Sequence, residues 1–276
     1  MGQGRRKPLI PISLLILATL FLRLLLSSCS VLEDRTGCPC RLHLLLICPE
    51  SAAPVESLSL LLSASSWEEI RSLALPPAGI IEMTVPKKKE GVALLAVVGP
   101  ETSGSLSACG FEIPLGTDCP SGLLLGAAHV DTDREEASCL LELHKSVCRL
   151  RLQWESGSLE PFPFQVRFLG DVAGFSPSGE LLEGEYSFVL PAFDEDGFAE
   201  AGIPRQRADG GALRMEILFS DEVLRSFAIG EIMARGGYDW TALDLADAEM
   251  QLDYARTRLT LRTRTWSETV EIEKVL

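Results

Sequence analysis

Short apolar stretches, separated by clusters of turn-forming residues, recur along the chain from residue 41 onward. Pro76-Pro77-Ala78-Gly79 and Gly99-Pro100 are two of these clusters. Regularly spaced short strands with turn signals between them are typical of β-sandwiches. We therefore expect strands at residues 41–48, 58–63, 80–85, 92–98, 123–130 and 139–143. The pattern at residues 67–75 fits either a further strand or a turn of helix.

The second half of the chain shows a strict alternation of apolar and polar residues. Between residues 147 and 154, one face would carry Cys148, Leu150, Leu152 and Trp154, and the other face Arg149, Arg151 and Gln153. The same alternation occurs at residues 250–254, 258–264 and 270–273. A period of two predicts strands with one buried and one wet face, as in antiparallel sheets.

One segment, residues 221–234, has a rough helical stripe instead. Asp221 would cap a helix whose apolar positions are Val223, Leu224, Phe227, Ile232 and Met233. No repeat is visible in the sequence, and the clean strand that begins at residue 147 marks the expected domain boundary. The chain is therefore predicted to be all-β, with two tandem β-sandwich domains at residues 29–146 and 147–276 and one short helix in the second.

The amino terminus has the pattern of a lipoprotein signal peptide, residues 1–28. A basic lead, Arg5-Arg6-Lys7, precedes an apolar run over residues 8–26 that is interrupted by Arg23. The run ends at Leu26-Ser27-Ser28-Cys29, a lipobox in which the thiol of Cys29 would receive diacylglycerol and, on its amino group, an acyl chain such as palmitate. The alternative is an uncleaved signal-anchor helix, because the apolar run is nearly long enough to span a bilayer. Arg23 disfavours that alternative.

Charge excludes some partners. The full chain carries a formal net charge of −14. Cleavage before Cys29 would remove four of the 25 basic residues and none of the 39 acidic ones, giving −18 (21 − 39). A body this acidic is repelled by nucleic acid and by anionic lipid headgroups. We therefore expect attachment to the membrane through the lipid on Cys29 and no nucleic-acid partner.

Eight cysteines would favour disulfides in an exported protein. Lipidation of Cys29 leaves seven, Cys38, Cys40, Cys48, Cys109, Cys119, Cys139 and Cys148. Their pairing cannot be read from the sequence, and an odd number leaves at least one thiol unpaired. Cys38, Cys40, His43 and Cys48 lie close together, but on one strand Cys40 and His43 would point to opposite faces, so we expect a disulfide-bearing first strand and no metal site.

The residues that carry catalysis are sparse. The three histidines are His43, His129 and His144, and none lies in a recognisable nucleophile motif. Asp194-Glu195-Asp196 is interpreted as a solvated loop, and Ala208-Asp209-Gly210-Gly211 as a hairpin turn. We therefore expect no enzyme activity, no small-molecule substrate and no cofactor besides the covalent lipid.

The carboxy-terminal segment is more specific. Residues 229–240, followed by Leu243, Asp247, residues 251–254 and a closing Trp266, resemble the ending of the FimB-like family of fimbrial anchor lipoproteins. The positions that match the family's pattern are Gly230, Glu231, Gly237, Tyr238, Asp239, Trp240 and Trp266. We interpret this motif as a signature of the fold, in which Tyr238 and Trp240 fill a core or corner and Asp239 caps the turn.

Four other regions are similar to the family, in the same order along the chain. Residues 29–39 look like its lipidated cysteine with an acidic-Arg stretch and Cys-Pro, and residues 130–145 like its inter-domain segment. Residues 171–175 resemble its glycine-phenylalanine turn, and residues 203–213 a strand entry. The resemblance therefore spans nearly the whole mature chain.

The resemblance implies a pair of transthyretin-like β-sandwich domains that anchor the base of a fimbrium in the outer membrane and limit its length. It implies fimbrillin or other fimbrial subunits as partners. Polymerising fimbrillins of this type exchange strands after a protease removes an amino-terminal strand. An anchor that keeps its first strand would have no open groove, so the alternating ending, residues 265–276, is expected to offer a strand and accept none.

Two alternatives belong to other classes. The first is a lipid-anchored adhesin or accessory fimbrial subunit that binds host protein or glycan, which would need a further ligand-binding domain or an aromatic-lined groove. The second is a carboxylate-based hydrolase, which would need two carboxylates facing one another in a deep cleft.

Overall fold

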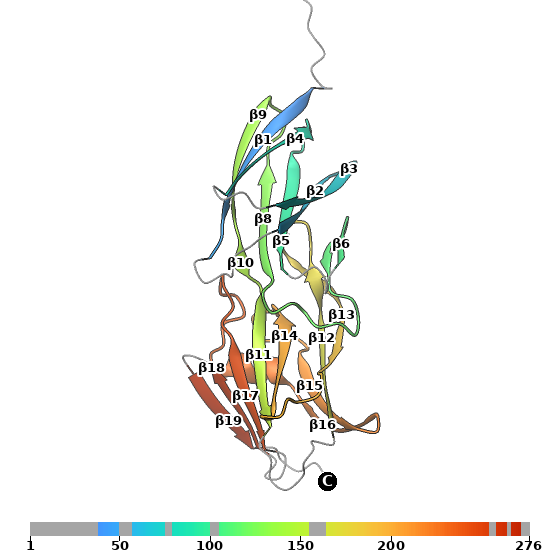
Figure 1. The fold of residues 1–276 in the computed structure, drawn as a ribbon, viewed down its shortest axis with the longest axis vertical. Coiled ribbons are helices and arrows are strands. Elements are labelled where there is room, and N and C mark those ends of the chain that lie inside the picture. The colour runs from blue at the N-terminus through green and yellow to red at the C-terminus, as the bar shows by residue number, and fades with distance from the viewer. Residues whose placement is uncertain are drawn as a thin grey trace, which may run out of the picture. The chain divides into compact units, whose positions relative to one another are not determined.

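A computed structural model gives the fold of residues 38–49, 57–74, 79–99, 105–154 and 164–253, and the backbone of residues 258–263 and 266–271. Pro39–Leu276 forms one compact unit. The expected signal peptide and Cys29 lie outside the described residues. Figure 1 shows the strands.

The first half of this unit contains two facing sheets. One has the order β4-β1-β9 and the other β10-β8-β5-β2-β3. Their strands are β1 (Pro39–Ile47), β2 (Ser57–Ala64), β3 (Trp67–Ala74), β4 (Ile80–Pro86), β5 (Val92–Val98), β8 (Leu124–Val130), β9 (Glu136–Glu142) and β10 (His144–Lys145). For residues 67–75 the sequence fitted either a strand or a turn of helix, and the structure has a strand there. This strand, β3, pairs with β2 along its whole length.

The second half repeats this arrangement. Its sheets have the orders β14-β11-β17-β18-β19 and β16-β15-β12-β7-β6, with β13 paired to β12. The strands are β6 (Ser105–Ser107), β7 (Gly110–Glu112), β11 (Val147–Trp154), β12 (Gln165–Phe175), β13 (Leu181–Val189), β14 (Phe198–Pro204), β15 (Arg214–Phe219), β16 (Glu222–Phe227), β17 (Ala248–Asp253), β18 (Arg258–Thr263) and β19 (Trp266–Glu271). The all-β sandwich fold predicted from the alternation is confirmed.

The connectivity of the two halves is the same. In each, the first strand lies between an antiparallel neighbour and a parallel one: β1 between β4 and β9, and β11 between β14 and β17. Likewise β2 pairs with β3 and β5, and β12 with β13 and β15. The sheets are mainly antiparallel, as expected, and each half adds one parallel pair because it returns to its first strand through a long connection. The boundary between residues 146 and 147 stays a prediction.

The repeat extends to individual side chains. Cys40, Leu42 and Leu44 of β1 are fully buried, as are their counterparts Cys148, Leu150 and Leu152 of β11, at no more than 1% exposure. On the outer face, Arg41 forms an ion pair with Glu136 at 3.3 Å, and its counterpart Arg149 forms one with Asp247 at 3.4 Å. The two sheets therefore share one register. The expectation that the sequence contains no repeat was wrong, since Cys-Arg-Leu-X-Leu occurs at residues 40–44 and at residues 148–152.

Residues 105–119, which we name the strap, leave the first half and pack on the second. Strand β7 pairs with the end of β12, and two glycines permit the close approach. A Cβ added at Gly110 would lie 2.0 Å from the carbonyl oxygen of Phe175, and one at Gly174 would lie 1.9 Å from that of Phe111. Gly174 and Phe175 are the last residues of β12, whose pairing with β13 is irregular. The glycine-phenylalanine turn expected at residues 171–175 is therefore the end of a strand.

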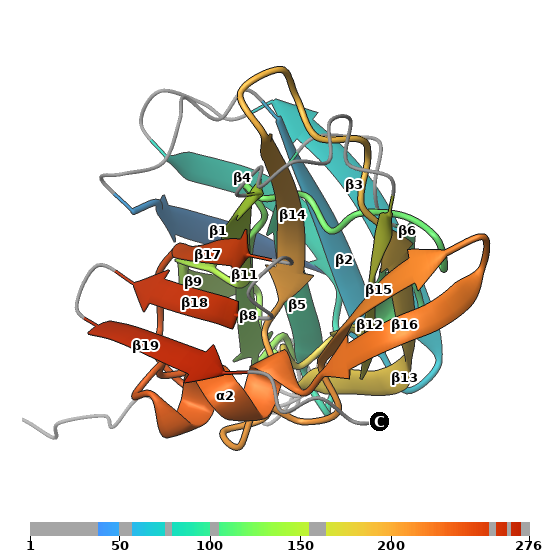
Figure 2. The same cartoon turned by 90° about the horizontal axis from the view of Figure 1, so that it is seen from below.

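The helix predicted at residues 221–234 was also wrong. Ser220 and Asp221 have positive φ angles of 50° and 66° and form the turn of the β15–β16 hairpin. Positive φ at both turn positions matches the right-handed twist of a hairpin, so Asp221 cannot cap a helix. Within residues 221–234 the helical part belongs to α2 (Ile229–Arg235), which Figure 2 shows below β19 in that view.

The seven described cysteines are free thiols, so the expected disulfide on the first strand was wrong. Cys40 points into the core of the first sandwich, and Cys48 follows the end of the same strand. Eight residues of extended chain separate the two by roughly 26 Å. A disulfide needs Cα atoms within about 7 Å.

Candidate functional site

The family-like motif follows α2 and ends it. The amide of Tyr238 donates to the carbonyl of Met233 at 2.9 Å, and that of Gly237 donates to the carbonyl of Ala234 at 3.1 Å. This pair of bonds is a Schellman motif, which places its C′ residue in the left-handed region. Gly237 has a φ of +92°, so the motif requires a glycine at this position.

The two aromatic residues of the motif are buried, as the sequence interpretation expected. Tyr238 is 6% exposed and Trp240 is 1% exposed, and their ring centroids lie 4.5 Å apart. The Tyr238 hydroxyl donates to the carbonyl of Ala246 at 2.6 Å. Burial, followed by the neighbouring Cys148, raises the pKa of Tyr238 well above its usual range, so the phenol stays protonated and serves as a donor.

Asp239 is exposed and closes the turn. Its Oδ1 accepts hydrogen bonds from the amide and the hydroxyl of Thr241, at 2.9 and 2.6 Å. These bonds lower the pKa of Asp239. The last residue of the motif, Trp266, begins β19, where its backbone pairs with Thr263. Its side chain lies outside the described residues.

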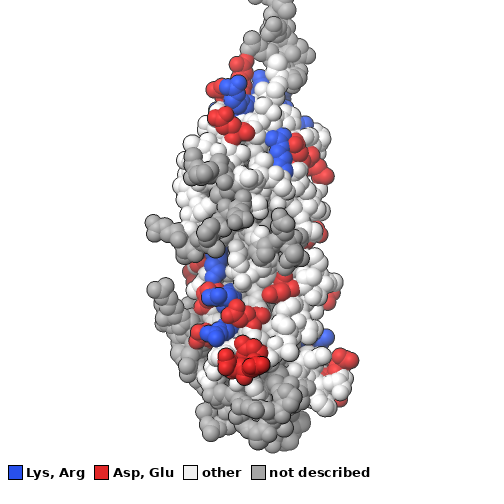
Figure 3. Space-filling model, in the orientation of Figure 1, with Lys and Arg blue, Asp and Glu red and all other residues white. Residues whose placement is uncertain are grey.

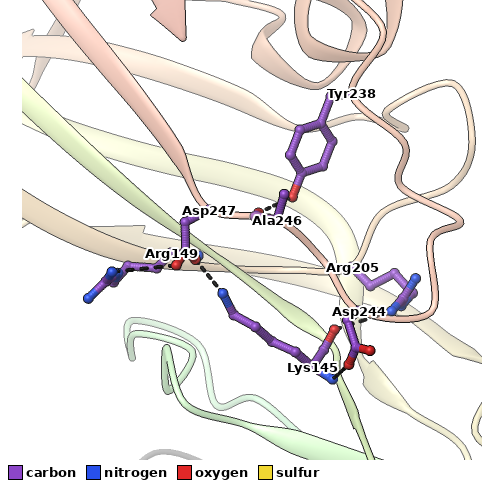
Figure 4. Close-up of polar contacts among 7 residues, drawn as sticks. All are labelled: Lys145, Arg149, Arg205, Tyr238, Asp244, Ala246 and Asp247. Atoms are coloured by element: carbon purple, nitrogen blue, oxygen red, sulfur yellow. Dashed lines mark hydrogen bonds and ion pairs between the residues drawn. The ribbon is translucent and has the colours of Figure 1, made fainter. Parts of the chain in front are cut away.

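The loop that follows the motif is held by one guanidinium. Nη1 of Arg205 donates to the carbonyls of Trp240, at 3.0 Å, and Ala242. Nη2 donates to the carbonyls of Leu243, at 2.7 Å, and Lys145, at 3.3 Å. Arg205 therefore ties residues 240–243 to the segment that joins the two halves of the chain (Figure 4).

Lys145 and two aspartates complete this joint. The backbone amide of Lys145 donates to Asp244 at 2.7 Å, and its ammonium group contacts Asp247. Asp247 also accepts from the amide of Arg149 at 2.9 Å. Three segments that resemble the family, at Lys145, Arg205 and Tyr238–Asp247, thus converge at one joint. The sequence indicated the segments but not their contacts, because the residues lie far apart along the chain.

The strap closes the outer edge of β14. Asp118 accepts from the amide of Gly202 at 2.8 Å, and the hydroxyl of Tyr186 donates to the carbonyl of Gly202 at 3.0 Å. Burial raises the pKa of Asp118 to about 6, against the hydrogen bonds from the amides of Gly202 and Cys119 that lower it. Side chains thus satisfy the backbone groups that an edge strand would otherwise offer to another chain. No pattern in the sequence indicates this contact.

The candidate catalytic residues do not form a cluster of metal ligands. His43 lies 3.4 Å from Glu82 on the outer face of the first sandwich, and His144 lies between Glu142 and Asp244. Asp194 accepts from the amides of Asp196 and Phe198, so it shapes its own turn. Among the residues described, no three His, Cys, Asp or Glu side chains are placed to hold a metal ion.

The surface offers two further features. On the face in Figure 3, acidic and basic groups lie next to each other rather than in separate fields. A groove of 730 Å³ in the second half is lined by residues that include Trp154, Phe164, Phe193 and the acidic run Asp194–Asp196. Within the described ranges, no helix has the length and apolarity needed to cross a bilayer.

The fold is similar to those of several bacterial surface proteins. A candidate polysaccharide-binding protein from Bacteroides thetaiotaomicron VPI-5482 superposes with a TM-score of 0.62 at 11% identity, over 85% of this chain and 99% of that one. A candidate adhesin from Bacteroides ovatus gives 0.61 at 12% identity, over 86% and 96%. The fimbrial anchor protein Mfa2 from Porphyromonas gingivalis gives 0.56 at 11% identity, over 83% and 99%.

No protein-family model and no curated protein matches the sequence. At these identities the structural likeness establishes a shared fold. A fimbrial anchor protein is among the proteins that have this fold, as the sequence resemblance predicted.

Replacement of Arg205 by Ala should destabilise the chain strongly. The substitution leaves carbonyls of the joint without their charged donor, which costs about 3 kcal/mol. Arg207→Ala is the matched control, because Arg207 is exposed and makes only surface ion pairs with Asp171 and Glu183, which are worth less than about 1 kcal/mol. Urea denaturation measures both variants, and equal losses would contradict the role given to Arg205.

Asp118 should make the chain more stable in mild acid than at neutral pH. Its folded pKa of about 6 lies above the ordinary value of 3.8, so the folded state binds the proton more readily than the unfolded state. Stability from this group therefore rises as the pH falls from above 6 toward 4. Thermal melting of the wild type and of Asp118→Asn at pH 7 and pH 5 measures the effect. The wild type should gain more on acidification, and parallel profiles would count against the assignment.

Proposed function

We propose that this chain is a lipid-anchored outer-membrane protein that holds the base of a fimbrium and limits its assembly. The observation that carries the proposal is the tandem-sandwich fold, which is similar to that of a fimbrial anchor protein over 83% of the chain. The lipobox that ends at Cys29 supports the lipid attachment. Membership of the FimB-like anchor family is part of the proposal.

The first sandwich supports a role at the end of a fibre. Strand β1 lies in the middle of its sheet, between β4 and β9, and its inward side chains are fully buried. A partner strand could replace β1 only if this core opened. The chain therefore accepts no partner strand at the position of β1. A fibre in which each subunit inserts a strand at that position of the next subunit would stop growing at this chain.

The second sandwich supports contact through its last strands. β18 and β19 extend the sheet of β11 and β17, and β19 is the outermost described strand of that sheet. An outer strand presents unpaired amides and carbonyls that a partner can use for sheet extension. The alternating carboxy-terminal segment, which contains β19, thus supplies the contact with the first fimbrillin.

Deletion of residues 266–276 should release fimbriae from the cell. The deletion removes β19, and the rest of the sheet keeps the pairing of β17 with β11 and β18. Fimbriae are measured in the medium and on cells, and resistance of the truncated chain to limited proteolysis shows that it folds. A second deletion, of residues 272–276 alone, leaves β19 in place and should retain fimbriae. Fimbriae that stay on cells after the longer deletion would refute the strand contact.

Replacement of Cys29 by Ala should release the chain together with its fimbriae, because the lipid is the proposed attachment. Cell fractionation followed by immunoblotting measures the distribution, and Cys38→Ala serves as a control that leaves the lipobox intact. Retention of the Cys29→Ala chain in the membrane fraction would favour the uncleaved helix.

Glycan binding is a second candidate function, favoured by the groove beside Phe164 and Phe193. Aromatic faces and carboxylates are the groups that proteins use to bind sugar rings and hydroxyls, and one protein with a similar fold is a candidate polysaccharide binder. Phe193→Ala should then reduce retardation in gels that contain mucin or bacterial capsular polysaccharide. Equal mobility of wild type and variant, with and without polysaccharide, argues against this function.

A further inference from the structure

The equivalent sheets of the two halves differ on their outer faces. In the second half, the residues directly opposite Gln153 on the two neighbouring strands are Phe198 and Gln251, and together they form a row across the sheet. The guanidinium of Arg151 covers the Phe198 ring of this row at 3.9 Å. In the first half, the counterpart of Gln153 is Leu45. This row is therefore polar or covered in one sandwich and aliphatic in the other.

The aliphatic row runs straight across the three strands of the first sheet. Leu45 of β1 lies directly opposite Ile80 of β4 and Leu140 of β9. The three side chains are 45%, 50% and 51% exposed. A single exposed aliphatic residue is ordinary, but a contiguous exposed row indicates an interaction surface. The opposite, inward faces of the same strands already form a complete core.

The row continues into a hollow at the joint. Leu140 lines this hollow, which has a volume of 400 Å³ and also includes Glu142, His144 and Leu243. Leu243 is 70% exposed and lies on the loop that Arg205 holds. The aliphatic row, Leu140 and Leu243 thus form one surface, which we name the row-and-hollow surface.

Two exposed carboxylates flank the hollow. Glu142 and Asp244 are exposed and lie on either side of His144, at 3.8 and 3.6 Å from its ring nitrogens. The nearby cations are engaged: Lys145 contacts Asp247, and Arg205 binds backbone carbonyls. The complementary ligand carries a positive charge beside its aliphatic side chains. A second copy of this chain, with a net charge of −14, fits poorly.

The spacing of the row fits an extended peptide. Neighbouring strands lie about 4.8 Å apart, so the row is roughly 10 Å long. Side chains on one face of an extended segment repeat every ~6.8 Å. Two alternate aliphatic side chains therefore fit within the row, and the next alternate position, roughly 14 Å from the first, lies beyond the row toward the hollow.

We propose that the row-and-hollow surface docks an extended segment of a fimbrial subunit, with alternate aliphatic side chains along the row and a Lys or Arg beside the exposed carboxylates of Glu142 and Asp244. The identity of the partner rests on the proposed function, but the surface is separate from β19. The chain would thus hold the fibre at two places.

The test uses the full lipidated chain, extracted in detergent, and purified fimbriae from the same bacterium immobilised on a sensor. The double variant Leu45→Ser/Leu140→Ser should bind about tenfold more weakly or worse, as for residues central to an interface. Glu142→Lys should also weaken binding, and the wild-type affinity should fall as salt rises. The matched control is Gln153→Ser, at the equivalent position of the second sandwich, which should bind like the wild type.

Several outcomes overturn the proposal. Binding of the double variant equal to that of the wild type, with unchanged thermal melting, removes the docking surface but leaves the proposed function intact. Sedimentation that shows a dimer dissociated by the double variant assigns the surface to a second copy. A wild-type chain that does not bind fimbriae refutes the docking surface and the proposed function together. Loss of binding in Gln153→Ser as well shows that the effect is not specific to the row.

Discussion

The arrangement of the joint depends on the guanidinium of Arg205. Four carbonyl oxygens, from Lys145, Trp240, Ala242 and Leu243, converge on its two terminal nitrogens. Carbonyls in a half-buried loop need donors, and a planar group with several N–H bonds can satisfy four of them at once. Lysine could not reproduce this geometry, because its three donors radiate from one nitrogen. The loop and the connection between the two halves are therefore fixed by the same side chain.

A second constraint acts on the sheet edges. Gly202 lies so close to the strap that an added Cβ would be 1.6 Å from the carbonyl oxygen of Cys119, and Asp118 and Tyr186 satisfy its backbone. This edge of β14 is thus closed to further strands, and the place of β1 is filled. The edge of β19 has no such cover among the described residues. This contrast between the covered Gly202 and β19 is the basis for proposing that a partner strand adds at β19.

The sequence predicted the strands well, because burial alternates with a period of two wherever one sheet face is wet. It also located the aromatic turn, since Gly237, Tyr238 and Trp240 occur in one short motif. The helix at residues 221–234 failed because a β15–β16 hairpin turn and a short helix together imitate one helical stripe. The joint could not be predicted, because Lys145 and Asp247 lie 102 positions apart and no local pattern marks their contact. The repeat was missed because its match in residue type is short: Cys-Arg-Leu-X-Leu occurs at residues 40–44 and again at residues 148–152.

The central claim is that this chain lies at the base of a fimbrium. Immunogold electron microscopy, with antibodies raised against the purified chain and cells that still carry fimbriae, tests that claim most directly. The account predicts gold particles where each fibre meets the cell surface. Particles along the shaft or at the free tip would contradict it.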